Sequence, residues 1–247
     1  MHFHLPKPLH GWREFAGEVG IIVIGVLIAL GVEQVVQAFH DRKVARDARE
    51  AINLEIAADL YDLGKRTRTE PCIARRLNEI DTLIGSATQA GTVKPLLWIG
   101  RPQVWTVQDS AWNSASQAGR TALFSAGDQK DYAAVYALME TVRRAELHEQ
   151  DVWAQLRGLE GEGRMPSASI IPLRSLVSQA RTDDWHIKVF SLQAKHFAAE
   201  RDIRPSDQDP LSQGSISVCV SSNTPRQRAI QIIDGNHPYL GSDYGEP

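Results

Sequence analysis

A run of fourteen residues without a charge, VGIIVIGVLIALGV at positions 19–32, constrains this chain more than any other feature. A helix that crosses the hydrocarbon layer of a membrane needs about 20 apolar residues, so the run alone is short for a span. Continuing it past Glu33 to Phe39 gives a helix of about 31 Å, which is long enough. The sequence therefore predicts a transmembrane helix at residues 15–39, preceded by a short segment, residues 1–14.

Two other interpretations of this run stay open. It is compatible with a secretion signal, whose cleavage site would be at residues 29–31, and with a buried helix of a soluble protein. Glu14 and Glu18 disfavour the signal, because an acidic flank before the apolar region is atypical. We expect membrane lipid around the helix, because side chains suited to the membrane interface flank it: Trp12, Phe15, Phe39 and His40.

Carboxylates and small residues share one stripe of the predicted span, covering about a third of its circumference at 100° per residue. Gly25 and Ala29 form a small-xxx-small pair, which lets two helices approach closely, and carboxylates in membranes usually face protein or water. The stripe is therefore a candidate self-association face, although such pairs also occur by chance in spans. Its candidate residues are Glu18, Gly25, Ala29 and Glu33, with Glu14 and Ile22 in the same phase.

The basic residues around the span leave its orientation open. Lys7 and Arg13 precede it, and four basic residues between Arg42 and Arg49 follow it. Counted simply, this distribution favours a cytoplasmic soluble domain, but a long domain can cross a membrane regardless of charge.

The rest of the chain predicts a mainly α fold, with a helical stalk and bundle at residues 40–204. Hydrophobic residues recur at spacings of four and three from Val44 to Leu63, so the span is expected to continue as a stalk helix ending near Gly64. Further helices are expected from Thr69 or Pro71 to Gly85, at 109–123, at 128–157 behind a capping box of Ser125 and Asp128, and at 172–201, the last with a possible break at Thr182.

The chain changes character after Arg204, where proline and glycine are dispersed among polar residues. Residues 205–247 are predicted to form a loop-rich tail packed on the bundle. Within the tail, Ile216, Val218 and Val220 alternate with polar residues, which is the period of a short strand.

Motifs for catalysis, cofactors or metals are not found. A formal net charge of −3, with cations scattered among acids, gives no basic face for nucleic acid. His148-Glu149 begins like a metalloprotease helix, but Val152 stands where the second histidine is needed, so a solvated helix face is expected there. We predict no catalytic, cofactor-binding or metal-binding residue.

Cys72 and Cys219 are the two cysteines, and three readings of them stay open. They can form a disulfide that tethers the tail to the second helix, which would place the domain in an oxidising compartment such as a bacterial periplasm. Cys72, expected near a helix N-terminus with Arg75 and Arg76 one turn on, can instead be a reactive thiol. Both can also be inert. We favour the disulfide, because a short strand in an irregular tail needs a tether.

The N-terminal part of the chain resembles a family of uncharacterised bacterial single-pass membrane proteins, a domain of unknown function. The resemblance covers residues 10–50 and rests on WREF at residues 12–15, Glu18-Val19, the run IIVIGVLIAL and Glu33-Gln34; a Pro-Cys-x-x-Arg-Arg-Leu segment at 71–77 is similar too. It implies an anchor in the bacterial inner membrane and a helical domain, and it brings no activity or catalytic residues.

These features favour a membrane-anchored structural or interaction module that binds a protein partner or forms a homo-oligomer. Two alternatives remain. One is a sensor-like ligand-binding bundle that needs a partner for its output, and the other is an envelope thiol enzyme using Cys72.

Overall fold

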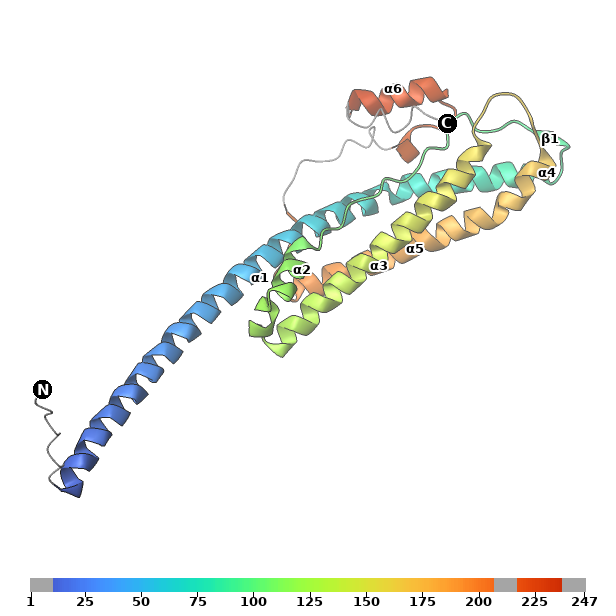
Figure 1. The fold of residues 1–247 in the computed structure, drawn as a ribbon. Coiled ribbons are helices and arrows are strands. Elements are labelled where there is room, and N and C mark those ends of the chain that lie inside the picture. Colours follow the sequence, from blue (N-terminus) through green and yellow to red (C-terminus); the bar gives the residue numbers. More distant parts are fainter. Residues whose placement is uncertain (1–10, 207–216, 237–247) are drawn as a thin grey trace, which may run out of the picture.

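One helix of 76 residues, α1 (Trp12–Ala87), runs from the N-terminal end of the fold to its far end. A computed structural model describes residues 11–206 and 217–236; residues 1–10 of the predicted N-terminal segment, and 207–216 and 237–247 of the predicted tail, lie outside this range. The first half of α1 projects alone, and the second half packs in a bundle (Figure 1). The expected mainly α fold, with a long apolar N-terminal helix continuing into the bundle, is confirmed.

The predicted end of the stalk at Gly64 and the new start at Thr69 or Pro71 are wrong, since both Gly64 and Pro71 lie inside α1. A glycine inside a helix costs about 1 kcal/mol and a proline about 3 kcal/mol. Burying one large aliphatic side chain contributes roughly 1.5–3 kcal/mol, so a few such residues offset both costs. The buried residues on either side of the two breakers are Leu60, Leu63, Ile73 and Leu77.

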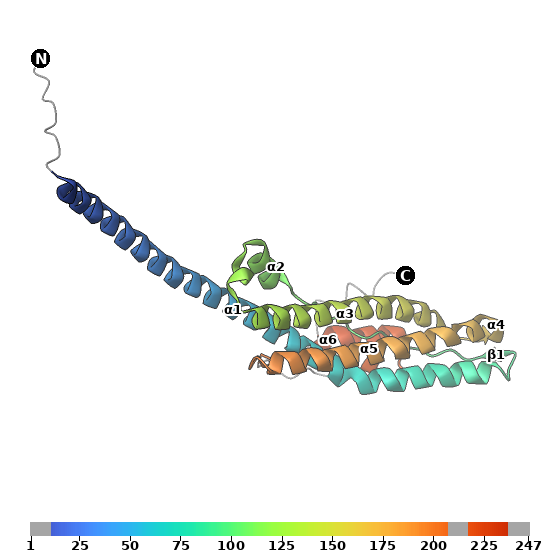
Figure 2. The same cartoon turned by 90° about the horizontal axis from the view of Figure 1, so that it is seen from below.

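Two further long helices complete the bundle: α3 (Ala126–Leu156) and α5 (Arg174–Ala199). α5 packs along α3 and along the second half of α1, and α3 meets α1 through long side chains. α3 runs parallel to α1 and α5 antiparallel (Figures 1 and 2). The predicted cap of α3 is confirmed, because the Ser125 hydroxyl accepts the Asp128 N–H at 3.0 Å. The possible break at Thr182 is absent; its hydroxyl donates to the Ser178 carbonyl inside α5.

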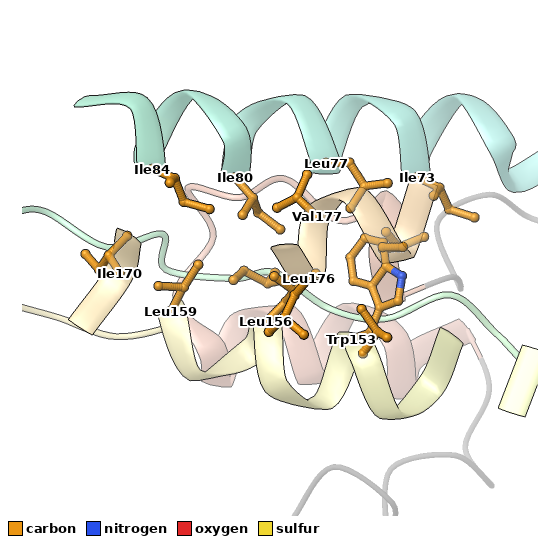
Figure 3. Close-up of a cluster of buried hydrophobic side chains, with 14 of the residues drawn as sticks. Ile73, Leu77, Ile80, Ile84, Trp153, Leu156, Leu159, Ile170, Leu176 and Val177 are labelled. Atoms are coloured by element: carbon orange, nitrogen blue, oxygen red, sulfur yellow. The ribbon is translucent and has the colours of Figure 1, made fainter. Parts of the chain in front are cut away.

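The bundle has two main hydrophobic clusters along its length. The distal one, in Figure 3, joins α1 to the end of α3 and the start of α5. The other, nearer the exposed apolar part of α1, joins residues 45–63 of α1 to the start of α3 and the end of α5. The residues labelled in the distal cluster are Ile73, Leu77, Ile80, Ile84, Trp153, Leu156, Leu159, Ile170, Leu176 and Val177.

Short elements connect the long helices. β1 (Thr92–Val93) pairs antiparallel with β2 (Met165–Pro166) at the distal end. From there residues 94–109, the return segment, run back along α1 to α2 (Ser110–Gln117) (Figure 1). The helix expected at 109–123 is thus split into α2 and the 3-10 turn η1 (Arg120–Leu123), with Gly119 between them at φ 67°. The α3–α5 connection holds η2 (Arg157–Leu159), α4 (Ser167–Ile170) and η3 (Ile171–Leu173).

The strand predicted at Ile216, Val218 and Val220 is not formed in the described part of the tail. Residues Ser217–Cys219 are a 3-10 turn, η5, and Ile216 lies outside the described residues. Val218 and Val220 are both buried, so their alternation reflects packing rather than a strand. The tail continues into a helix that was not predicted, α6 (Arg226–Asn236), whose Ala229 and Ile233 pack against Trp98.

Candidate functional site

The N-terminal part of α1 has an apolar surface that the other described residues do not cover. An 18-residue window there has a mean hydropathy of 2.5 and no part of it is buried. Ile21 is 74% exposed and Phe39 is 65% exposed. The first side chain of α1 to be buried in the bundle is Ala45. An apolar surface of this extent needs a non-aqueous environment, and the helix is long enough to cross a membrane.

The predicted self-association stripe lies on this uncovered part. Glu18, Gly25, Ala29 and Glu33 are all exposed, and a Cβ added to Gly25 would meet nothing within 4 Å. The face is therefore open to close approach by a second helix, and self-association through it stays a prediction.

Cys72 and Cys219 lie at disulfide-bonding distance, with their sulfur atoms 2.10 Å apart and their Cα atoms 5.0 Å apart. The link joins α1 to η5 across 147 residues of sequence. The helix N-terminus expected beside Cys72 does not exist, because Cys72 lies in the interior of α1. Without free N–H groups there, the helix dipole gives no support to a thiolate, which removes one of the two reasons for a reactive Cys72.

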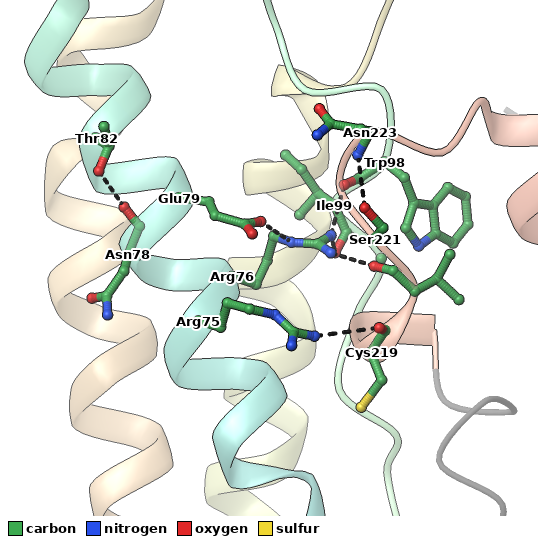
Figure 4. Close-up of polar contacts among 12 residues, drawn as sticks. Arg75, Arg76, Asn78, Glu79, Thr82, Trp98, Ile99, Cys219, Ser221 and Asn223 are labelled. Atoms are coloured by element: carbon green, nitrogen blue, oxygen red, sulfur yellow. Dashed lines mark hydrogen bonds and ion pairs between the residues drawn. The ribbon is translucent and has the colours of Figure 1, made fainter.

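Arg76, one turn beyond Cys72, is fully buried and binds two irregular segments at once (Figure 4). Its guanidinium donates to the carbonyls of Trp98, at 2.6 Å, and Ile99 in the return segment, and to that of Val220 beyond η5. Glu79 accepts from its Nε at 2.8 Å. Because burial disfavours the charged form, it lowers the pKa of Arg76. This role was not predicted from the sequence, although an arginine in phase with the apolar residues of the helix was a visible signal.

A polar layer crosses the centre of the bundle. Arg66 of α1 donates through Nη2 to Glu149 Oε1 of α3 at 2.9 Å and to Asp184 Oδ1 of α5 at 2.8 Å. The solvated helix face predicted at His148-Glu149 is therefore wrong for Glu149, which is buried. His148 is 56% exposed and its Nδ1 lies 2.8 Å from Asp183 Oδ2. The layer ties all three long helices together.

Glu146 lies in the same layer, and no cation is bonded to its carboxylate among the described residues. It is buried, and neither oxygen has a hydrogen bond of good geometry among the described residues, although the main chain of Trp105 lies close by. Burial raises the pKa of Glu146 to about 8, and it raises the pKa of Glu149 to about 7 against the opposing effect of Arg66. The layer therefore retains a proton at neutral pH.

Two carboxylates of α1 hold the end of the return segment. Glu55 Oε2 accepts from the Ser110 hydroxyl at 2.7 Å and from the Ala111 N–H at 2.8 Å, which caps the start of α2. Asp59 Oδ1 accepts the Gln108 N–H at 3.0 Å, and burial raises the pKa of Asp59 to about 7. These contacts explain why α1 has acids on its buried side.

A pocket of about 470 Å³ lies beside α2, against α3. On its aromatic side, Trp112 stacks on Tyr136 with ring centroids 5.4 Å apart. The Tyr136 hydroxyl donates to Glu55 Oε1 at 2.6 Å, which fixes that ring. The other lining residues are Val107, Asp109, Asn113, Glu140 and Arg143. The pocket combines an aromatic face with charges of both signs.

No family model, no curated protein and no solved structure matches this chain. Within residues 11–206 and 217–236, no three His, Cys, Asp or Glu side chains are grouped so that they could hold a metal ion.

The polar layer predicts a pH dependence. The folded pKa of Glu146, about 8, lies above the ordinary value of 4.5, so the folded chain holds a proton that the unfolded chain releases between these values. Stability should therefore fall as the pH rises through this window, and Glu146 alone contributes up to about 1.4 kcal/mol per pH unit. The variant Glu146→Gln cannot ionise at this position, so its stability should fall less as the pH rises. Part of the pH dependence should remain, because the pKa values of Glu149 and Asp59 are raised too.

The measurement is the thermal unfolding midpoint of the full chain in neutral detergent between about pH 5 and about pH 8.5. Glu140→Gln is the matched control, because Glu140 is half-exposed and its pKa is lowered by a hydrogen bond from Arg143. This control should keep the wild-type slope. An unchanged slope in Glu146→Gln would contradict the assignment.

Proposed function

We propose that this chain is a single-pass membrane protein whose helical bundle acts as a structural or interaction module, docking a protein partner or a second copy. The observation that carries the proposal is the continuity of α1. Its uncovered apolar part and its packed part belong to one helix without a break, so the bundle is held rigidly at a membrane rather than tethered to it flexibly.

The buried ionisable groups favour this role over an enzyme that uses Cys72. Arg76 and Glu55 are occupied in binding main-chain groups of the return segment and α2, and Arg66 joins the three long helices. Cys72 lies against Cys219. Each of these groups has a structural partner, which supports a scaffold as the function of the bundle.

The cysteine pair also supports a location for the bundle. Disulfides persist in oxidising compartments. We infer that the anchor lies in a bacterial inner membrane and that the bundle faces the periplasm, which agrees with the ability of long domains to cross a membrane regardless of flanking charge.

Location and orientation can be tested together in whole cells that express the full chain. We expect the chain to stay in the membrane pellet after alkaline carbonate washing. After acid quenching, a mass-shifting maleimide should label Cys72 and Cys219 only if the sample is first reduced. Labelling of both without reduction would place the bundle in the cytoplasm, and release by carbonate would contradict the anchor.

Self-association through the stripe is tested by replacing its small residues with large ones. The double variant Gly25→Leu and Ala29→Leu should weaken any oligomer, because the added side chains keep two helices apart. The matched control is Gly20→Leu with Gly31→Leu, which adds the same kind of bulk more than about 100° around the helix. Chemical crosslinking in membranes measures the outcome; an identical oligomer yield in both double variants would contradict the proposed face.

A ligand-sensing bundle is a second candidate, and the pocket beside α2 favours it. The Trp112–Tyr136 stack forms one wall, and the Glu55 contact of Tyr136 connects that wall to α1, which leads to the membrane. If the pocket holds a small molecule, one should be recovered by mass spectrometry from the denatured wild type. It should be recovered from Trp185→Ala, an exposed tryptophan on α5, but not from Trp112→Ala. Equal recovery from all three proteins would remove this candidate.

A further inference from the structure

A second pocket, of about 400 Å³, lies at the membrane-proximal end of the bundle. One wall is formed by α1 and the other by the turn that follows α5, so two segments about 150 residues apart in sequence meet there. Its lining residues are Arg46, Arg49, Glu50, Asn53, Leu54, Ala57, Asp202, Ile203 and Arg204.

The position of this pocket follows from the rise of α1. Arg46 lies seven residues beyond Phe39, the end of the apolar part, which is about 10 Å along the helix. The headgroup layer extends roughly 5–8 Å beyond the hydrocarbon core. The near end of the pocket, at Arg46, is therefore next to the headgroups, and its far end, at Ala57, is about 27 Å beyond Phe39. A tilt of the helix toward the pocket side brings the lining closer.

Main-chain hydrogen bonds hold the turn after α5 in one conformation, and this fixes the backbone position of Arg204 beside α1. Asp202 has φ 57°, and the N–H groups of Asp202 and Ile203 donate to the last carbonyls of α5, both at 3.0 Å. The Ser206 N–H donates to the Ala57 carbonyl of α1 at 3.0 Å, which keeps the turn against that helix.

Three guanidinium groups line the pocket, and two of them lack strong partners. Arg204 is exposed and forms no ion pair with any described residue. Arg46 is 73% exposed, and its ion pair is with its neighbour in sequence, Asp47, at 3.3 Å. Arg49 is held by Asp128 at 3.1 Å, and its Nε is buried without a hydrogen-bond partner. Guanidinium groups suit phosphate, because their fork matches two phosphate oxygens.

The other lining residues add an apolar floor and two acceptors. Leu54 is 67% exposed there, with Ala57 and Ile203 beside it. Glu50 and Asp202 can accept hydrogen bonds from hydroxyl or ammonium groups. A phospholipid headgroup presents this combination: a phosphate, a polar substituent with donors and an adjoining apolar part.

We propose that this pocket binds the phosphate of a membrane lipid headgroup, with Arg46, Arg49 and Arg204 contacting it. The inference rests on the proposed membrane anchor and adds a specific lipid contact to it. Such a contact would fix the height and rotation of the bundle above the membrane.

The test is a lipid titration of the full chain in neutral detergent, followed by native mass spectrometry with phosphatidylglycerol as the probe. Arg46→Glu with Arg204→Glu reverses two exposed charges of the pocket. The matched control, Lys94→Glu with Arg174→Glu, makes the same change at exposed residues of the distal end. Circular dichroism confirms folding of each protein. Lipid affinity should fall about ten-fold in the pocket variant and stay within about two-fold in the control.

A second arm of the test distinguishes a lipid from a soluble phosphate. Glycerol 3-phosphate or inorganic phosphate at millimolar concentration should leave the bound lipid in place; displacement at that concentration would assign the pocket to a soluble phosphate and overturn the lipid source. Equal lipid affinity in all three proteins would overturn the pocket itself. Because carbonate extraction of the same wild type reports the anchor independently, failure of this inference and failure of the proposed function are distinguishable.

Discussion

The continuity of α1 is the constraint on which the other elements depend, because one helix has to satisfy two environments. Its first part is apolar around its whole circumference, which suits lipid, and its second part is apolar on one side, which suits a bundle. The helix crosses Gly64 and Pro71 without ending, since the buried side chains around them contribute more than the two residues cost. The bundle is consequently assembled along the same helix that has the exposed apolar segment.

The direction of α3 then explains the buried charges. α1 ends at the distal end, but α3 starts at the opposite end of the bundle, so the chain has to return along about 46 Å of helix, the length of α3. Sixteen residues, 94–109, span at most about 55 Å when extended but only about 24 Å as a helix, so the return segment runs without a helix of its own until α2. Its main-chain groups lack helical partners inside a core, and Arg76 and Asp59 supply them. Glu55 then binds the first turn of α2, which follows the segment.

The sequence predicts the parts of this structure that depend on local pattern. The apolar period of α1 and the Ser125 cap of α3 follow from spacing and residue type. The approach of Cys72 to Cys219 was favoured among three open readings, although the strand that it was expected to tether is a turn. The parts that it misses depend on tertiary contacts. Pro71 would end an isolated helix but not a packed one, and the alternation at Val218 and Val220 arises because both side chains pack inward from a turn.

Buried ionisable residues were the hardest group to predict, because their burial also depends on tertiary contacts. A glutamate such as Glu149 usually indicates solvent, and only the simultaneous positions of Arg66 on α1 and Asp184 on α5 make its burial tolerable. The layer that they form crosses the centre of the bundle, where α1 packs against the α3–α5 pair. A partner that moved the α3–α5 pair relative to α1 would have to separate these charges. Because that separation is costly, we expect the pair and α1 to move together as one rigid body.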